Sequence, residues 1–314
     1  MLPSVSIVTI NWNSAHQLRE CLESLVKIDC QEFKLDKVIV VDNASTDRSI
    51  DGLEHLDLPL HIIRNSVNQG FGAACNQGAA ISNSDYLLFL NPDTRVSQDS
   101  IGRSVTFMEE SSHQKVGVVG VQLIDEHGQV QRNCVRFPST LTFCCNILGI
   151  DKILKNHLTS YKMTEWDHEN TQKVDQIMGA FYLIRGELFQ RLEGFDERFF
   201  VYFEDLDLSY RVHKLGWSSY YLADVRSFHK GGGTSENVKS TRLFYFVRSR
   251  ILYAYKHFNL LQATTIALAS LSIEPVTRII FALLKRSIPQ AKETIFGYAK
   301  IFKSLKSIAK STRP

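Results

Sequence analysis

Two short acidic segments, far apart in the chain, carry side chains suited to sugar-nucleotide chemistry. The first, Leu-Asn-Pro-Asp-Thr at 90–94, ends the apolar run 86–90, so Asp93 would lie at the C-terminal end of a buried strand. Open α/β sheets bind their ligands at that edge. The second, Phe-Glu-Asp-Leu-Asp-Leu at 203–208, opens a helical pattern and offers Asp205 as a general base. Together the two segments predict a sugar-nucleotide site.

Short apolar runs alternate with helical stretches over residues 1–130, and this order predicts the elements that would carry Asp93. Strands separated by helices form βαβ units, which place a parallel sheet between layers of helices. No GxGxxG follows the first strand, so a dinucleotide-binding dehydrogenase is disfavoured. The predicted strands are 5–10, 37–41, 60–64 and 86–90, and the predicted helices lie near 15–27, 47–54 and 72–82.

The pattern becomes mixed over residues 116–228, which include the second acidic segment. Asp207 and Arg211 stand four residues apart on a predicted helix and can pair with each other, which leaves Asp205 free. Glu204 stays open as a rival base. The elements predicted here are strands at 116–123, 176–185 and 218–225, a loop-rich stretch at 132–173 and the helix at 204–215.

Polar loops follow two further predicted strands. The segment Val-Val-Asp-Asn-Ala-Ser-Thr-Asp at 40–47 places Asp42 just beyond a strand. A carboxylate there can accept a base N–H or ribose hydroxyls, or it can simply shape the turn. The loop at 64–72, with Asn68 and Gly70, can approach a nucleotide closely, although Asn and Gly are also ordinary turn residues.

Four segments follow one another at the ends of successive predicted strands: VTINWN, VVDNASTD, NxxNxGFGAACNQG and LFLNPDT. Together with residues 179–217 and FHKGGGTS at 228–235, they resemble the family-2 glycosyltransferases, and most closely the bacterial rhamnosyltransferase-like enzymes of polysaccharide and O-antigen synthesis. The resemblance covers residues 4–258. It implies the GT-A fold, an α/β architecture in which helices flank a Rossmann-like, mixed and mainly parallel sheet.

The resemblance also implies roles for individual residues. Asp93 matches the acidic metal-binding signature and His229 matches a histidine that helps to hold the ion in several relatives, so Mg²⁺ or Mn²⁺ is expected. Asn91 stands at the first acidic position of that signature, and its amide supplies less charge than a carboxylate. Asp205 matches the general base, with Glu204, Asp207 and Arg211 as supporting residues. The expected contacts of the nucleotide-sugar donor are Thr9, Asn11, Asp42, Asn43, Asn68, Gly70, Asn91 and Asp93.

The expected reaction is a single displacement at the anomeric carbon. Breaking the bond to the diphosphate builds negative charge on the leaving group, which the ion and backbone N–H groups would stabilise. Asp205 would take the proton of the acceptor hydroxyl on the opposite face, so the hexosyl transfer would invert the anomeric carbon.

The family resemblance favours dTDP-L-rhamnose as donor and a glycan linked to undecaprenyl diphosphate as acceptor. UDP-hexose or UDP-galactofuranose would use the same motifs. Two other classes stay open: an inactive glycan-binding scaffold, disfavoured by the intact Asp93, Asp205 and His229, and a sugar-phosphate nucleotidyltransferase. The latter normally needs a Gly-rich, basic loop after the first strand, where this chain has Asn11-Trp12-Asn13.

Composition agrees with an intracellular enzyme. A chain of 314 residues with 44% hydrophobic and 22% charged residues can bury a full core. The six cysteines show no CxxC pair and no matching histidine spacing, so we expect neither a zinc site nor a disulfide framework, and a reducing compartment fits best. The N-terminus shows no signal-peptide pattern, so a secreted precursor is not expected.

The C-terminal part forms a separate basic segment. From Lys239 onward there are 14 Lys and Arg against two acidic residues, a net charge of +12 in a chain that carries +3 overall, which leaves −9 for the rest. Such blocks favour an anionic surface. A nucleic-acid tail is disfavoured because no recognition module accompanies it.

Residues 260–273 form an uncharged stretch that is shorter than the roughly 20 residues of a spanning helix. Further on, Ile301, Leu305 and Ile308 line one helical face and lysines cover the other, which predicts an interfacial helix on an anionic membrane. A helical cap with a solvated basic face is the alternative.

These patterns predict a catalytic domain over 1–258, followed by a membrane-associating segment over 259–314. Within the catalytic domain, residues 1–130 would bind the nucleotide sugar, and residues 131–258 would carry the base and bind the acceptor. The predicted location is cytoplasmic, on the inner face of the cell membrane.

Overall fold

The structure, a computed structural model, describes residues 1–153, 161–231 and 239–312. The chain divides into two compact units. Unit 1 comprises 1–135, 166–197 and 204–234, and unit 2 comprises 136–165, 198–203 and 235–314. The helix Lys239–His257, which the sequence reading placed in the catalytic domain, belongs to unit 2. The functions assigned to the predicted domains stay predictions.

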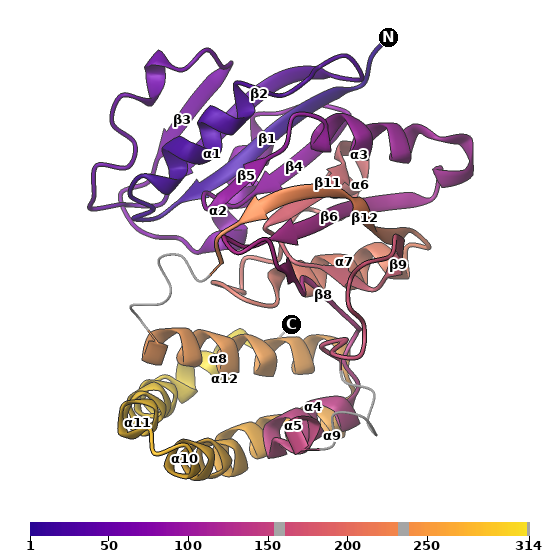
Figure 1. The fold of residues 1–314 in the computed structure, drawn as a ribbon. Coiled ribbons are helices and arrows are strands. Elements are labelled where there is room, and N and C mark those ends of the chain that lie inside the picture. The colour runs from indigo at the N-terminus through magenta and orange to yellow at the C-terminus, as the bar shows by residue number, and fades with distance from the viewer. Residues whose placement is uncertain (154–160, 232–238, 313–314) are drawn as a thin grey trace. The chain divides into compact units, whose positions relative to one another are not determined.

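Unit 1 is built on a ten-stranded mixed sheet (Figure 1). Its strands are β1 (Ser4–Asn11), β2 (Lys34–Asp42), β3 (Leu60–Arg64), β4 (Tyr86–Leu90), β5 (Thr94–Val96), β6 (Val116–Ile124), β7 (Val130–Gln131), β9 (Gln172–Val174), β11 (Phe181–Arg185) and β12 (Ser218–His229). The main order is β3-β2-β1-β4-β11-β6-β12-β5, in which β1 to β4 run parallel and β11 runs antiparallel to both of its neighbours. Two short strands, β8 (Cys134–Val135) and β10 (Gln176–Ile177), pair separately.

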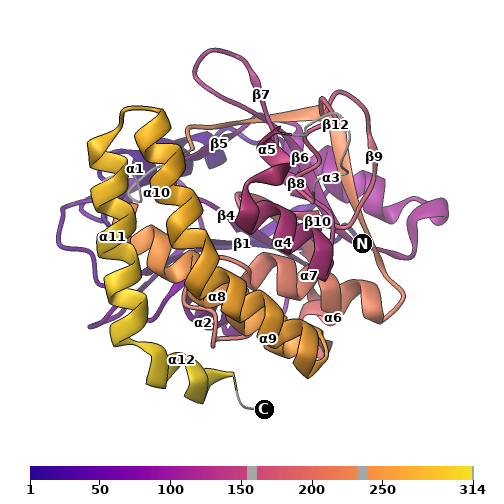
Figure 2. The same cartoon turned by 90° about the horizontal axis from the view of Figure 1, so that it is seen from below.

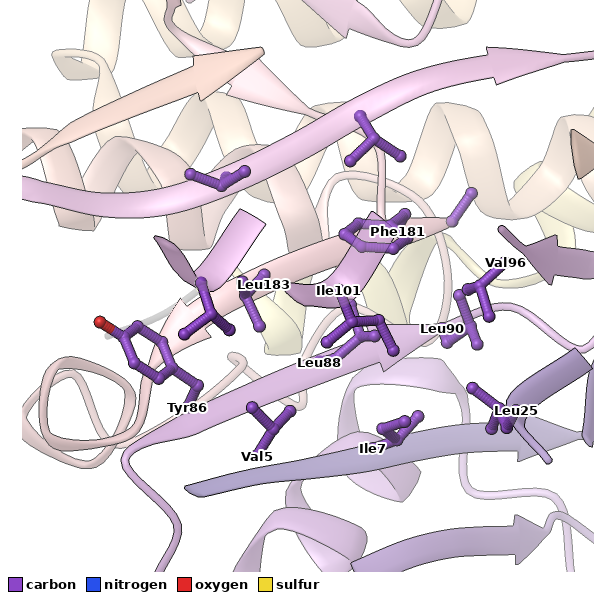
Figure 3. Close-up of a cluster of buried hydrophobic side chains, with 14 of the residues drawn as sticks. Val5, Ile7, Leu25, Tyr86, Leu88, Leu90, Val96, Ile101, Phe181 and Leu183 are labelled. Carbon is purple, nitrogen blue, oxygen red and sulfur yellow. The ribbon is translucent and has the colours of Figure 1, made fainter. Parts of the chain in front are cut away.

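Every residue of β4 is buried, because helices cover both faces of a parallel sheet and each side chain of the strand then meets apolar partners. The close-up in Figure 3 shows Ile7, Leu88, Leu90, Phe181 and Leu183 in one apolar cluster drawn from β1, β4 and β11. The helices of this unit are α1 (Gln17–Leu25), α2 (Phe71–Ala80), α3 (Ser100–Glu109), α6 (Gly186–Arg191) and α7 (Glu204–Lys214).

The predicted helix at 47–54 is wrong. The chain makes turns there, with only a short 3₁₀ helix at Leu53–His55. The Asp47 carboxylate accepts hydrogen bonds from the backbone N–H groups of Ala15 and Ser49, while Asn13 Oδ1 accepts from Thr46 N. The Asp and Asn side chains thus accept hydrogen bonds from backbone N–H groups. Such bonds compete with the hydrogen bonds of a helix.

Unit 2 is helical. It contains α4 (Thr140–Leu148), α5 (Ile150–Ile153), α8 (Lys239–His257), α9 (Leu260–Leu268), α10 (Glu274–Leu284), α11 (Ile288–Lys303) and α12 (Leu305–Ser311). The stretch at 132–173, expected to be loop-rich, therefore includes a real helix, α4. Its start carries a capping box, in which Ser139 accepts from Thr142 N and the Thr142 hydroxyl accepts from Ser139 N.

The expectation that the helix beginning at Leu260 is too short to span a membrane is also wrong, because the helix continues past Glu274, where the uncharged stretch ends. A π-helical turn, Ala269–Ile273, joins α9 to α10, so one helical stretch runs from Leu260 to Leu284 and is long and apolar enough to cross a membrane (Figure 2). Pro275 does not break this stretch, since it lies in the first turn of α10, directly after the wider turn that accommodates its missing N–H.

The stripe of Ile301, Leu305 and Ile308 does not form a lipid-facing surface. Ile301 and Ile308 are buried in a core with Tyr298 of α11 and Val247 and Ile251 of α8. The helix also ends between them, because α11 stops at Lys303 and α12 starts at Leu305. Ile301 and Ile308 therefore stabilise unit 2, whereas Leu305 is exposed, so for these two residues the structure supports the alternative of a helical cap.

A tight backbone contact positions β11, and it generates a prediction. A Cβ added at Gly186 would stand 2.2 Å from the Ser84 carbonyl oxygen, while Gly186 N donates to Asp85 O. We expect Gly186→Ala to destabilise unit 1 by about 1–3 kcal/mol, because backbone has to move. Thermal unfolding followed by circular dichroism measures this.

The matched control is Gly102→Ala on α3, where a Cβ has no neighbour nearer than 3.7 Å. This substitution should leave stability unchanged or raise it by up to about 1 kcal/mol, because alanine favours helix. Equal melting temperatures for the two variants would contradict the tight contact at Gly186.

Candidate functional site

Strand pairing brings Asp93 and His229 together. Strand β12 runs antiparallel to β5, with His229 opposite Thr94, and Lys230 N donates to Asp93 O. The side chains converge so that His229 Nε2 lies 3.4 Å from Asp93 Oδ1, and both are at most one-tenth exposed. The sequence placed these residues at distant strand ends, and the sheet makes them neighbours.

Gln131 fixes the tautomer of His229. Its Nε2 donates to the His229 carbonyl oxygen at 2.7 Å, which orients the amide and leaves Oε1 facing His229 Nδ1 at 2.7 Å. An amide oxygen only accepts, so Nδ1 carries the proton. When the imidazole is neutral, the lone pair of His229 Nε2 therefore faces the Asp93 carboxylate.

This arrangement fits a divalent ion. Two acceptors that face each other repel unless a proton or a cation lies between them. Ligands at about 2.1 Å from a metal stand about 3.0–3.4 Å apart when adjacent, and the observed separation is 3.4 Å. Within the described residues no group of three or more His, Cys, Asp or Glu side chains could hold a metal, so Asp93 and His229 would supply only part of a coordination shell.

Asp205 lies at the N-terminus of α7 and accepts three hydrogen bonds. Gln176 Nε2 and Gly179 N donate to Oδ2 at 3.0 and 3.1 Å, and Leu206 N donates to Oδ1 at 2.7 Å. Burial raises the pKa of Asp205 above its usual range, and these three donors oppose the rise because they stabilise the carboxylate. The backbone N–H of Asp205 itself also stabilises the carboxylate.

Glu204 lies in a different environment. It is buried, and its Oε2 has no hydrogen-bond partner in the part of the chain that the structure describes. Burial, and to a lesser degree the neighbouring Asp205 carboxylate, raise the pKa of Glu204 well above its usual range. A carboxyl that holds its proton is a poor general base, so these surroundings favour Asp205 for that role.

Asp207 and Arg211 form the predicted pair, with Arg211 Nε donating to Asp207 Oδ2 at 2.8 Å. The remaining guanidinium nitrogens donate to the carbonyl oxygens of Leu192 and Gly194, both at 2.7 Å. These contacts fix α7 against the turn after α6, so the pair positions the helix that carries Asp205.

The two acidic segments are held by adjacent residues of one strand connection. Gly179 N donates to Asp205, whereas the next carbonyl, Ala180 O, accepts from Asn91 N at 3.1 Å and from Thr94 Oγ1 at 3.2 Å. The backbone at 179–180 therefore contacts both α7, which carries Asp205, and the turn that carries Asp93. Gln131, Gln176 and Gly179 were not among the predicted site residues.

At the ends of β1 and β2, polar side chains order one another. Asn11 Nδ2 donates to Asp42 Oδ1 at 2.7 Å, and both residues are nearly inaccessible. Asn11 Oδ1 and the buried Thr9 hydroxyl find no hydrogen-bond partner within the described residues. Asn11 thus orients Asp42, whereas direct contact of Thr9, Asn11 or Asp42 with a nucleotide stays a prediction.

Asn43 organises the loop at 65–70. Its Nδ2 donates to Asn68 Oδ1 and to Gly70 O, while its Oδ1 accepts from Gln69 N. Gly70 has φ +92° and stands just before α2, a backbone conformation that side chains rarely adopt. The structure therefore gives Asn43, Asn68 and Gly70 a definite role in shaping this loop, and their contact with the donor stays a prediction.

Comparison with protein families and curated proteins shows which known proteins the chain resembles. Residues 6–158 match the glycosyl transferase family 2. The chain is 25% identical over 274 residues to N-acetylglucosaminyl-diphospho-decaprenol L-rhamnosyltransferase of Mycobacterium tuberculosis, covering 82% of this chain and 86% of that protein. It is 26% identical over 260 residues to the rhamnosyltransferase WbbL of Escherichia coli, covering 79% and 92%.

Solved structures match the fold. The mannosyltransferase PcManGT from Pyrobaculum calidifontis, in complex with GDP-Man and Mn²⁺, has a TM-score of 0.55 at 18% identity, covering 99% of this chain and 85% of that one. Staphylococcus aureus TarS 1–349 with UDP-GlcNAc has a TM-score of 0.53 at 16% identity, covering 97% and 92%. The fold is GT-A, and the chain is a glycosyltransferase whose residues 6–158 match glycosyl transferase family 2 and whose curated relatives include rhamnosyltransferases.

Proposed function

We propose that this enzyme transfers L-rhamnose from dTDP-L-rhamnose to a hydroxyl of a lipid-linked glycan in cell-surface polysaccharide synthesis, with inversion of the anomeric carbon. The observation that carries the mechanism is the anchoring of Asp205 and of the Asn91–Thr94 turn by the adjacent residues Gly179 and Ala180. The donor and acceptor rest on the relative that acts on N-acetylglucosaminyl-diphospho-decaprenol. A lipid-linked acceptor agrees with a cytoplasmic location on the inner face of the membrane.

In this proposal the Asp205 carboxylate accepts the proton of the attacking hydroxyl. The three donors hold the carboxylate in place, and its raised pKa makes it a stronger base than a free aspartate. Asp93 and His229 would hold a divalent ion, which when bound stabilises the negative charge of the leaving diphosphate. Asp42 would accept hydrogen bonds from the nucleoside.

A UDP-hexose or UDP-galactofuranose donor is the second candidate. The structural neighbours carry GDP-Man or UDP-GlcNAc on the same fold, so the fold tolerates different donors. Thermal stabilisation of the purified protein by a panel of nucleotide sugars, with and without Mn²⁺, tests the choice. The largest shift is expected with dTDP-L-rhamnose, and a larger shift with a UDP-sugar would replace it as the proposed donor.

The role of Asp205 predicts the behaviour of Asp205→Asn. The amide keeps the shape but loses the proton acceptor, so kcat should fall by about 10²–10⁴ while donor affinity, measured by calorimetry, changes little. Glu204→Gln is the control and should keep most activity. If Glu204→Gln were inactive and Asp205→Asn active, the role of base would move to Glu204.

The raised pKa of Glu204 predicts a pH-dependent gain in stability for Glu204→Gln. A carboxyl whose pKa is raised on folding supports the fold below its unfolded pKa, near 4.3, and loses that contribution as the pH rises through the folded value. Glutamine is neutral at every pH. The variant should therefore melt higher than the wild type at pH 7–8, and this gap should close near pH 4.

Glu126→Gln, at an exposed glutamate, is the control. Its melting temperature should not rise above that of the wild type at pH 7–8. A constant difference in melting temperature between Glu204→Gln and the wild type over the same pH range would contradict the assignment of a buried, protonated Glu204.

The metal site predicts the behaviour of Asp93→Ala and His229→Ala. Each variant should need about 10–100-fold more Mn²⁺ for half-maximal activity and should lose metal-dependent donor binding in calorimetry, because each removes a ligand of one ion. The exposed His127→Ala is the control. Full activity of the wild type in excess EDTA would rule out this metal-dependent mechanism.

A further inference from the structure

The helical stretch from Leu260 to Leu284 in unit 2 presents a continuous apolar face to solvent. We define the outer face as five exposed apolar residues that lie along one side of it: Leu261, Leu268, Val276, Ile280 and Leu284, each between 51% and 78% exposed. They recur after about one or two helical turns, so they lie along one side of the helix. The positions between them on this side include Thr265 and Ser272, which carry no charge.

The opposite face of the same helix is packed inside unit 2 and combines small or apolar residues, such as Ala263 and Ile266, with the polar Ser270 and Glu274. Its only charged residues are Glu274 and Arg278, and Glu274 is 3% exposed. Glu274 forms ion pairs with Arg278 and with the fully buried Arg250 of α8. The Tyr298 hydroxyl of α11 donates to Ser270 O at 3.0 Å. The exposed side therefore carries large apolar residues and no charge, whereas the exposed side of a helix that faces water is normally polar or charged.

The adjoining helix extends the apolar surface and supplies positive charge. Helix α11 lies beside α10 in Figure 2 and packs against it. Ile295 and Phe296 of α11 are more than half exposed. Exposed cations lie in the turn between α10 and α11 and along α11 itself: Lys285, Arg286, Lys292, Lys300 and Lys303.

We propose that the outer face lies in the headgroup and acyl boundary of an anionic lipid bilayer, with the helix in the plane of the membrane. Charge complementarity favours an anionic bilayer on this face. The sequence from Lys239 onward contains 14 basic residues and two acidic ones, Glu274 and Glu293. Glu274 is buried in ion pairs. An apolar face flanked by Lys and Arg is typical of interfacial helices. One side packs on unit 2 through ion pairs, so only the other side can enter lipid.

This inference goes beyond the transfer reaction and does not depend on it. It also changes the surface expected from the sequence, since Ile301 and Ile308 are core residues. Deleting the C-terminus is therefore an unsuitable test, because it would remove Tyr298, Ile301 and Ile308 from the core of unit 2.

The test uses the full-length protein with three exposed positions changed together, Leu268→Gln, Val276→Gln and Ile280→Gln. Affinity is measured by co-sedimentation with vesicles of phosphatidylcholine and phosphatidylglycerol. We expect binding by the wild type and a loss of at least roughly tenfold in the triple variant, because the lost apolar contacts add up. Leu2→Gln, at a residue of unit 1 that is 55% exposed and outside the predicted donor-binding loops, is the control and should bind normally.

A second variant separates the charge contribution. Lys285→Gln with Arg286→Gln should weaken binding to the mixed vesicles and change binding to pure phosphatidylcholine little. Wild-type affinity in the triple variant, or no vesicle binding by the wild type at low salt, would overturn the proposal. A wild-type dimer in light scattering that the triple variant converts to monomer would also overturn it, because a second copy would then cover the face.

Circular dichroism and melting temperature show whether each variant is folded. Calorimetric donor binding on the same proteins distinguishes the two proposals, since a failure of the membrane face leaves donor binding intact.

Discussion

The candidate site depends on one short connection, the backbone between β10 and β11. Gly179 donates its N–H to the Asp205 carboxylate, and Ala180 offers its carbonyl oxygen to the turn that carries Asp93. Because β11 pairs antiparallel with β4, Phe181 stands opposite Leu90, which places this connection where β4 ends. A shift in the register of β11 would displace both acidic segments at once, since they share these two residues. The Gly186 contact and the β4–β11 register therefore matter for chemistry as well as for stability.

Much of the α/β arrangement could be predicted because apolar runs and motif positions depend on local sequence. β3 and β4 lie as predicted, and α7 ends within one residue of its predicted position. Only the family resemblance predicted that Asp93 and His229 lie close together. The spacing of residues along the sequence could not predict it, because their closeness arises from pairing between β5 and β12. Gln131 and Gln176 were missed for the same reason. The helix expected at 47–54 does not form, because carboxylate and amide side chains accept hydrogen bonds from the backbone N–H groups there. Helix propensity does not take such bonds into account.

The C-terminal region shows a different limit of sequence reasoning. A helical stripe such as Ile301, Leu305 and Ile308 has the same periodicity whether it faces a protein core or a lipid surface, and only packing distinguishes the two. Here α8 covers Ile301 and Ile308, whereas the outer face of the helix from Leu260 to Leu284 stays uncovered in unit 2. The sequence could not show that Glu274 and Arg250 are buried, because a charged residue is ordinarily assigned to the surface.

The central claim is that Asp205 acts as the single base of an inverting transfer. The most direct measurement is the anomeric configuration of the product, read by NMR from the coupling at the anomeric carbon after transfer from dTDP-L-rhamnose to a soluble acceptor. A single displacement predicts the configuration opposite to that of the donor. Retention of the donor configuration would require a second displacement or a different mechanism, and it would contradict the account.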